Sequence, residues 1–244
     1  MVPGQQRVHR RPDCAGRRGP TIVIHYYPDG SRTDEPNVGL AEFRALEPSL
    51  DEVFRCCGPE TKGVYVFKAL DRDYLDGLIG GRLRYGYKLM WEISEDACKP
   101  ENADVIESYL KYIDVFSINR GEAKMLYGVD DEAEAERRLA AASPNWVFFR
   151  RGSQGAHMLA QGVSYDCPSA HDIQVVDTTG GGNSSSGAVL YACCEGYSPR
   201  MAGCMGSAAA AEIIKQFGVP DLFTPELTRG AMERAQRLCG EKND

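Results

Sequence analysis

Short apolar runs alternate with amphipathic segments through the middle of the chain, and this alternation constrains the fold more than any other feature. Apolar runs at residues 64–67, 87–94, 114–119 and 145–151 are typical of buried strands. A segment between them begins at Pro100 with acidic residues and repeats apolar positions at helical spacing. Strands that alternate with helices predict an α/β fold with a mostly parallel sheet covered by helices on both faces.

The pattern changes in the last third of the chain. Residues 152–166 are typical of hairpins, and residues 173–176 are expected to form one further strand. The following segments have helical patterns, and the first two are rich in Ala, Gly and Ser, so that their backbones can approach closely. The three helices are predicted at residues 183–197, 198–218 and 224–238.

Composition limits the classes of partner. The 244 residues are 43% hydrophobic and carry a formal net charge of -7, which argues against nucleic acid as a partner because phosphate backbones select clustered Lys and Arg. No apolar run reaches the ~20 residues of a membrane helix. The nine cysteines contain no CxxC pair, which argues against zinc and favours reduced thiols in the cytosol.

Two regions are distinguished by composition. Residues 1–20 are rich in Arg, Pro and Gly without an apolar period, and we expect a disordered tail, with a basic arm or transit peptide as the alternative. Residues 21–240 are expected to form a single domain, since no long linker or internal repeat interrupts them.

A glycine-rich loop, "DTTGGGN" at 177–183, precedes the first of the late helices. Glycines without a Cβ let the backbone approach an anion, and a helix N-terminus offers open N–H groups. Gly180 to Asn183 are therefore a candidate anion hole. The alternative is a tight turn into the helix with Asn183 as its N-cap.

Two more polar stretches follow predicted strands. Asn119 and Glu122 in "NRGE" would lie at the carboxyl edge of the sheet, where they can orient a hydrated Mg²⁺. The alternative is the start of a surface helix. The stretch "RRGSQGA" at 150–156 can wrap a nucleotide, and the alternative there is a simple glycine turn.

The order of these stretches resembles the pfkB (ribokinase-like) family of carbohydrate kinases, whose second signature usually reads DTTGAGD. The resemblance covers roughly residues 60–220. The GGGN variant, the "WE" at 91–92 and the "GVP" at 218–220 look like a divergent branch that includes proteins similar to the fungal maintenance-of-killer type. The resemblance implies a three-layer sandwich whose amino-terminal strands and lid are incomplete. The recognisable part would start near "TIVIHYYPDGSR".

The resemblance also implies site residues. The anion hole for the transferred phosphoryl group would be Gly180, Gly181, Gly182 and Asn183. The nucleotide and its Mg²⁺ would be bound by Asn119, Glu122, Gly152, Ser153, Gly155 and Ser207. A monovalent cation, K⁺, would be bound at Asp177 and Thr179. The implied activity is ATP-dependent phosphoryl transfer to a sugar or another small hydroxylated substrate.

The chain departs from the family at three places. Asn183 stands where the family has the Asp that takes a proton from the substrate hydroxyl, and an amide cannot act as a general base. Arg150 stands where a Thr is usual; it is expected to be a surface charge, with phosphate binding as the alternative. The opening strand and its glycines have no counterpart in the sequence. These departures leave a weak kinase and an inactive nucleotide-binding pseudokinase as the two hypotheses, whereas a Rossmann dehydrogenase lacks its G-x-G-x-x-G loop.

Overall fold

The computed structural model describes residues 7–10, 21–26 and 32–240. The described residues fall into two compact units, one up to Arg55 and one from Cys56 onward. The first unit holds a three-stranded antiparallel sheet in the order β1-β2-β3 and two short helices. Its elements are β1 (Arg7–Arg10), β2 (Thr21–Tyr26), β3 (Arg32–Pro36), α1 (Leu40–Arg44) and α2 (Leu50–Arg55).

The expected tail and lid both involve this first unit. Within residues 1–20, positions 7–10 form a strand that pairs with β2, and the rest lie outside the described residues. The lid-like stretch that begins at Thr21 contributes β2 and β3, whose connection at 27–31 is also outside the described part. A single domain over residues 21–240 stays a prediction.

The second unit is built on a six-stranded sheet in the order β4-β5-β6-β7-β8-β9. The first four strands are parallel and the last two antiparallel, as the four apolar runs and the hairpin pattern predicted. The strands are β4 (Gly63–Lys68), β5 (Lys88–Ile93), β6 (Val115–Asn119), β7 (Trp146–Arg150), β8 (Ala156–Ala160) and β9 (Val163–Cys167).

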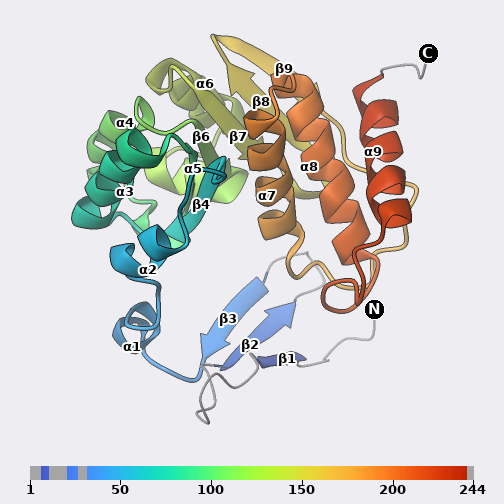
Figure 1. Cartoon of the computed structure of the whole chain (residues 1–244), viewed down its shortest axis with the longest axis horizontal. Coiled ribbons are helices and arrows are strands. Elements are labelled where there is room, and N and C mark those ends of the chain that lie inside the picture. Colours follow the sequence, from blue (N-terminus) through green and yellow to red (C-terminus); the bar gives the residue numbers. More distant parts are fainter. Residues whose placement is uncertain (1–6, 11–20, 27–31, 241–244) are drawn as a thin grey trace. The chain divides into compact units, whose positions relative to one another are not determined.

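Helices cover both faces of this sheet, which confirms the α/β sandwich (Figure 1). On one face α3 (Arg72–Tyr85), α5 (Arg120–Tyr127) and α6 (Glu132–Ala142) contact the parallel strands, with α4 (Ala103–Leu110) beside them. On the other face lie α7 (Gly181–Cys194) and α8 (Pro199–Ile214), and α9 (Pro225–Cys239) packs on α8. Three 3₁₀ turns complete the unit, at Glu95–Ala97, Pro100–Asn102 and Gly152–Gln154.

The strand expected at residues 173–176 is wrong. The β8–β9 hairpin already occupies that edge of the sheet. The segment instead runs to the end of α8, where the carbonyl of Ile214 accepts the N–H groups of Val176 at 2.8 Å and Asp177 at 3.1 Å. The carbonyls in the last turn of a helix have no hydrogen-bond partner within the helix. The two N–H groups supply that partner to the Ile214 carbonyl, so the segment is held by the end of α8 and not by a neighbouring strand.

Candidate functional site

A pocket of about 450 Å³ lies where β6 and β7 end and α7 begins. It brings together most of the residues that the resemblance assigned to a nucleotide. Those predicted residues that line it are Asn119, Gly152, Ser153, Gly155, Gly181, Gly182 and Ser207. Its apolar lining includes Ile173, Val175, Ala210, Ala211 and Ile214. We call it the glycine-loop pocket.

The glycine loop enters α7 through a residue that must be glycine. Gly180 is the N-cap and has φ +84°, a conformation that side chains disfavour. The alternative of an Asn N-cap is therefore wrong: Asn183 is the third residue of the helix and its side chain is exposed. The N–H of Gly181 donates to the Thr178 carbonyl at 3.2 Å. Because a glycine cap has no side chain to accept the next N–H groups, it leaves those of Gly182 and Asn183 open toward a ligand.

The residues predicted for a monovalent cation form a tight turn just before the loop. The Oδ1 atom of Asp177 accepts hydrogen bonds from the backbone N–H and the hydroxyl of Thr179, at 3.1 and 2.9 Å. Asp177 is buried, and neither residue is among those that line the glycine-loop pocket. The turn fixes where the three glycines begin.

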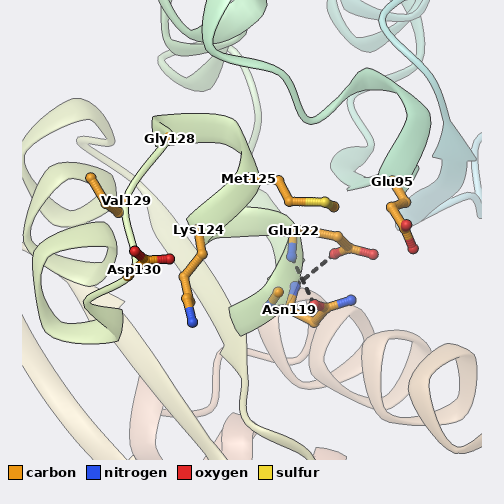
Figure 2. Close-up of a pocket in the computed structure, with 9 residues that line it drawn as sticks. Glu95, Asn119, Glu122, Lys124, Met125, Gly128, Val129 and Asp130 are labelled. Atoms are coloured by element: carbon orange, nitrogen blue, oxygen red, sulfur yellow. Dashed lines mark hydrogen bonds between the residues drawn. The ribbon is translucent and has the colours of Figure 1, made fainter. Parts of the chain in front are cut away.

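Asn119 and Glu122 start α5 with reciprocal hydrogen bonds (Figure 2). The Asn119 side chain accepts the N–H groups of Gly121 and Glu122, at 2.8 and 3.0 Å. The Glu122 carboxylate accepts the N–H of Asn119 at 2.7 Å. Such a capping box stabilises a helix start by itself, so the pair has a structural role whether or not it also orients an ion.

A second, more open pocket of about 490 Å³ adjoins this helix start. Figure 2 shows Glu122 beside Glu95, with Lys124 and Asp130 farther along α5 and the loop after it. Burial raises the pKa of Glu122, and the nearby Arg150 opposes this. In the described part of the chain no group of three or more His, Cys, Asp and Glu side chains is arranged to hold a metal ion.

The predicted nucleotide loop after β7 is a short 3₁₀ turn closed by Gly155. This residue has φ +86°, and a Cβ there would lie 2.3 Å from the carbonyl oxygen of Cys167. Any side chain would therefore collide with the backbone of β9. The N–H of Arg151 donates to the Gly155 carbonyl at 2.8 Å, which holds the turn shut.

Arg150 is not the surface charge that we expected. It lines the glycine-loop pocket, its side chain is only 15% exposed, and it forms an ion pair of 2.9 Å with Glu92. Glu92 is buried and also accepts hydrogen bonds from the hydroxyls of Tyr65, at 2.7 Å, and Ser186. Burial, and then the Glu92 charge, raise the pKa of Tyr65 far above its ordinary range, so the phenol stays a donor.

The sequence carried one indication of this cluster. Glu92 interrupts an apolar strand, "KLMWEI", and a carboxylate at a buried strand position needs a partner. The sequence does not identify the partner, because Arg150 lies on a strand two places away in the sheet.

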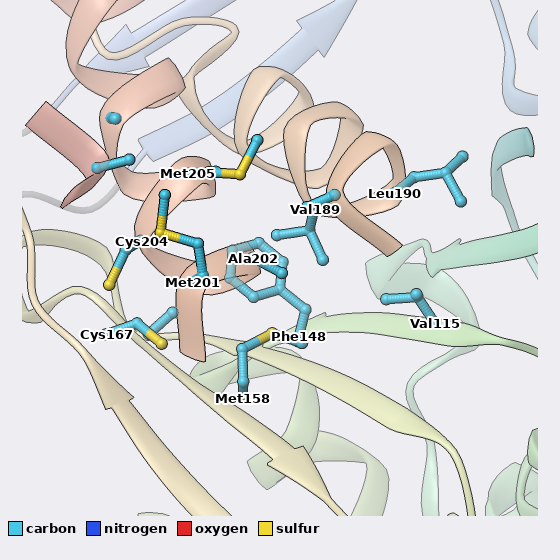
Figure 3. Packing of buried hydrophobic residues seen from close by; sticks show 14 of the residues in the cluster. Val115, Phe148, Met158, Cys167, Val189, Leu190, Met201, Ala202, Cys204 and Met205 are labelled. Atoms are coloured by element: carbon cyan, nitrogen blue, oxygen red, sulfur yellow. The ribbon is translucent and has the colours of Figure 1, made fainter. Parts of the chain in front are cut away.

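Helices α7 and α8, which supply part of the pocket wall, pack closely through buried side chains such as Val189, Met201 and Phe148 (Figure 3). Gly206 allows the contact: a Cβ there would lie 3.0 Å from Val189 and 3.2 Å from Phe148. Gly203 is tighter, since its Cβ would lie 2.3 Å from the sulfur of Cys167. These small residues confirm the close approach expected of the Ala- and Gly-rich helices.

None of the helices in the described ranges has both the length and the apolar character that a membrane span needs.

The chain superposes on solved structures of kinases. A probable sugar kinase from Rhizobium etli is 22% identical and superposes with a TM-score of 0.67, covering 90% of this chain and 65% of that one. An adenosine kinase from Sinorhizobium meliloti is 20% identical with the same TM-score, covering 87% and 65%. At these identities the likeness confirms the ribokinase-like fold.

Two curated relatives are fungal. An uncharacterized protein of Schizosaccharomyces pombe is 28% identical over 167 residues, which are 57% of this chain and 46% of that protein. Protein MAK32 of Saccharomyces cerevisiae is 31% identical over 173 residues, which are 61% of this chain and 47% of that protein. The chain thus spans about half the length of the curated relatives it matches.

The profile of the pfkB family carbohydrate kinases matches residues 94–226. This match includes the helix start at Asn119, the turn at Gly152–Gln154, the glycine loop and both helices that form the pocket wall. Since it covers more than half of the sequence, the chain belongs to the pfkB family of carbohydrate kinases.

Proposed function

We propose that the chain is a pfkB-type phosphotransferase that moves the terminal phosphoryl group of ATP to a hydroxyl of a sugar or related small molecule. The observation that carries this proposal is the glycine-loop pocket. It joins the open N–H of Gly182, in the first turn of α7, to the turn at Gly152–Gln154 and to Ser207 on α8. The glycine backbone suits the phosphates of a nucleotide, and the small apolar side chains elsewhere in the pocket suit its base.

The residues in the described part fit the expected ions through different contacts. Glu122 already accepts the N–H of Asn119, and it fits a hydrated Mg²⁺ contacted through water. The bound ion would supply charge neutralisation on the phosphates. Asp177 and Thr179 are the residues proposed for K⁺. Their carboxylate and hydroxyl oxygens are hard ligands of the type that such a cation takes.

The proposed chemistry is slow because of Asn183. The N–H groups of Gly182 and Asn183 bind the phosphoryl oxygens, since the N–H of Gly181 already donates to the Thr178 carbonyl, and the Asn183 side chain orients the substrate hydroxyl by a hydrogen bond. The amide does not take the hydroxyl proton, which passes to the transferred phosphoryl group or to water as ADP leaves. Loss of general-base assistance costs about 10²–10⁴-fold in rate. Positioning and electrostatics still operate in phosphoryl transfer, so a residual rate remains.

Transfer is tested by measuring ADP release and phosphorylated product over a panel of sugars and nucleosides. The control is Gly181→Asp, because a Cβ at Gly181 would lie 2.9 Å from the side chain of Ile214 and the carboxylate would repel phosphate. We expect turnover above this control for the natural chain and faster turnover for Asn183→Asp. Absence of turnover in both would refute the kinase proposal.

A second function, nucleotide binding without catalysis, is favoured by the same Asn183. It predicts that ATP binds, that no substrate is phosphorylated, and that Asn183→Asp gains nothing. The cytosolic location and the absence of nucleic-acid partners that the composition suggested stay predictions.

A further inference from the structure

The glycine-loop pocket has an uneven distribution of charge. Of the described residues that line it, one side chain carries a permanent charge, the guanidinium of Arg150, and no carboxylate lines it. The acidic residues nearest to this arginine, Glu92 and Glu122, lie outside that lining. In a protein with a net charge of -7, this pocket presents a positive group to its ligand.

The guanidinium is held by one of its two terminal nitrogens. Its Nη2 atom lies 2.9 Å from Glu92 Oε1 and 3.7 Å from Glu122 Oε2. The other terminal nitrogen, Nη1, lies against the glycine loop, since a Cβ added at Gly182 would be 2.7 Å from it. Anchoring at Nη2 therefore directs Nη1 to the place where the first turn of α7 leaves its N–H groups open.

Glu92 is itself fixed, which makes the arrangement rigid. The hydroxyls of Tyr65 and Ser186 both donate to its Oε2 atom, and Oε1 is left to pair with Arg150. The five donors of an arginine allow one edge to bind a carboxylate while another binds phosphate.

We propose that Arg150 is a phosphate-binding residue of the nucleotide site, and that Glu92 is the positioning residue that aims it at the terminal phosphate beside Gly182. This inference rests on the proposed function, because it takes the ligand of the glycine-loop pocket to be a nucleotide. It adds a charged ligand at a position where the family resemblance leads one to expect a neutral Thr.

The test is calorimetric titration of the full chain with Mg-ATP and with AMP. Arg150→Gln should weaken Mg-ATP binding about 10- to 100-fold, as loss of a charge-assisted hydrogen bond does, and change AMP binding less than about twofold. Arg150→Lys should recover part of the loss. Arg150→Gln leaves the buried Glu92 carboxylate without its counter-charge, so the double variant Glu92→Gln/Arg150→Gln is measured as well. The double variant should fold and show the same selective loss of Mg-ATP affinity.

The matched control is Arg82→Gln. Arg82 on α3 also pairs with a buried carboxylate, Asp114 at 2.8 Å, but it does not line the pocket. The Arg82→Gln variant should be less stable than the natural chain but bind ATP and AMP with unchanged selectivity. Unchanged ATP affinity in Arg150→Gln and in the double variant, or equal losses for ATP and AMP, would overturn the inference and leave the kinase proposal standing. A folded natural chain that binds no ATP would overturn both.

Discussion

The contact between Gly182 and Arg150 can be tested by adding a single methyl group. In Gly182→Ala the new Cβ would lie 2.7 Å from Nη1, whereas ordinary contact begins at 3.4 Å. The guanidinium must therefore move by about 0.7 Å, the difference of these two distances. A swing of this size directed away from Glu92 lengthens the distance between Nη2 and the Glu92 carboxylate from 2.9 Å to about 3.6 Å, beyond hydrogen-bonding range.

Two effects oppose each other in this variant. Alanine in place of glycine stabilises a helix by up to about 1 kcal/mol. Loss of a charge-assisted hydrogen bond costs about 1.5–3 kcal/mol. The loss outweighs the gain, so we expect Gly182→Ala to lower the free energy of unfolding by about 0.5–2 kcal/mol.

Gly187 is the matched control on the same helix. Its Cβ would meet nothing within 4 Å, so Gly187→Ala should raise the free energy of unfolding by about 1 kcal/mol. The two variants should thus differ by about 1.5–3 kcal/mol, which urea denaturation resolves. In an Arg150→Gln background, where the shorter side chain ends before Gly182, the difference should shrink to about 0.5 kcal/mol. Equal effects of the two alanines in the natural background would refute the reasoning.

Three further predictions concern other parts of the site. Gly155→Ala should lower the free energy of unfolding by at least about 1–3 kcal/mol and abolish nucleotide binding, because its Cβ would lie 2.3 Å from the Cys167 carbonyl; calorimetry and denaturation measure both. Asn183→Asp should raise the rate of phosphoryl transfer by up to about 10²–10⁴-fold, and a rate rise of less than twofold would contradict the role given to this position. Burial raises the pKa of Glu122, so the folded chain binds its proton more tightly than the unfolded chain, and stability falls as the pH rises through the range just above 4.5. Glu122→Gln should remove the contribution of this carboxyl to the pH dependence of the free energy of unfolding. An unchanged pH dependence would contradict a raised pKa of Glu122.

Local patterns predicted the elements of the sheet well, because each depends on neighbours in sequence. The four parallel strands, the hairpin and the three late helices all lie where periodicity placed them. The prediction of a strand at residues 173–176 was wrong because strands and extended segments that pack on a helix end share the same apolar pattern. The deciding partner, the carbonyl of Ile214, is almost forty positions away in the chain.

The candidate site was predictable to the extent that it depends on backbone. Glycines and a helix start show in the sequence, and Gly155, Gly181 and Gly182 line one pocket. The Glu92–Arg150 pair was not predictable. A charged residue at a strand end reads as exposed unless its partner is known, and strand order supplies that partner.

The bonds to Ile214 have a consequence for motion. The amides of Val176 and Asp177 share one acceptor at the last turn of α8, and helix ends are the parts that open most easily. Both amides should therefore exchange hydrogen with solvent at the rate at which that turn frays, although one of them adjoins a buried carboxylate. A ligand that contacts Ile214 and holds the last turn of α8 in place would slow the exchange of both amides together, so the segment before the glycines reports on occupancy of a pocket that neither amide lines.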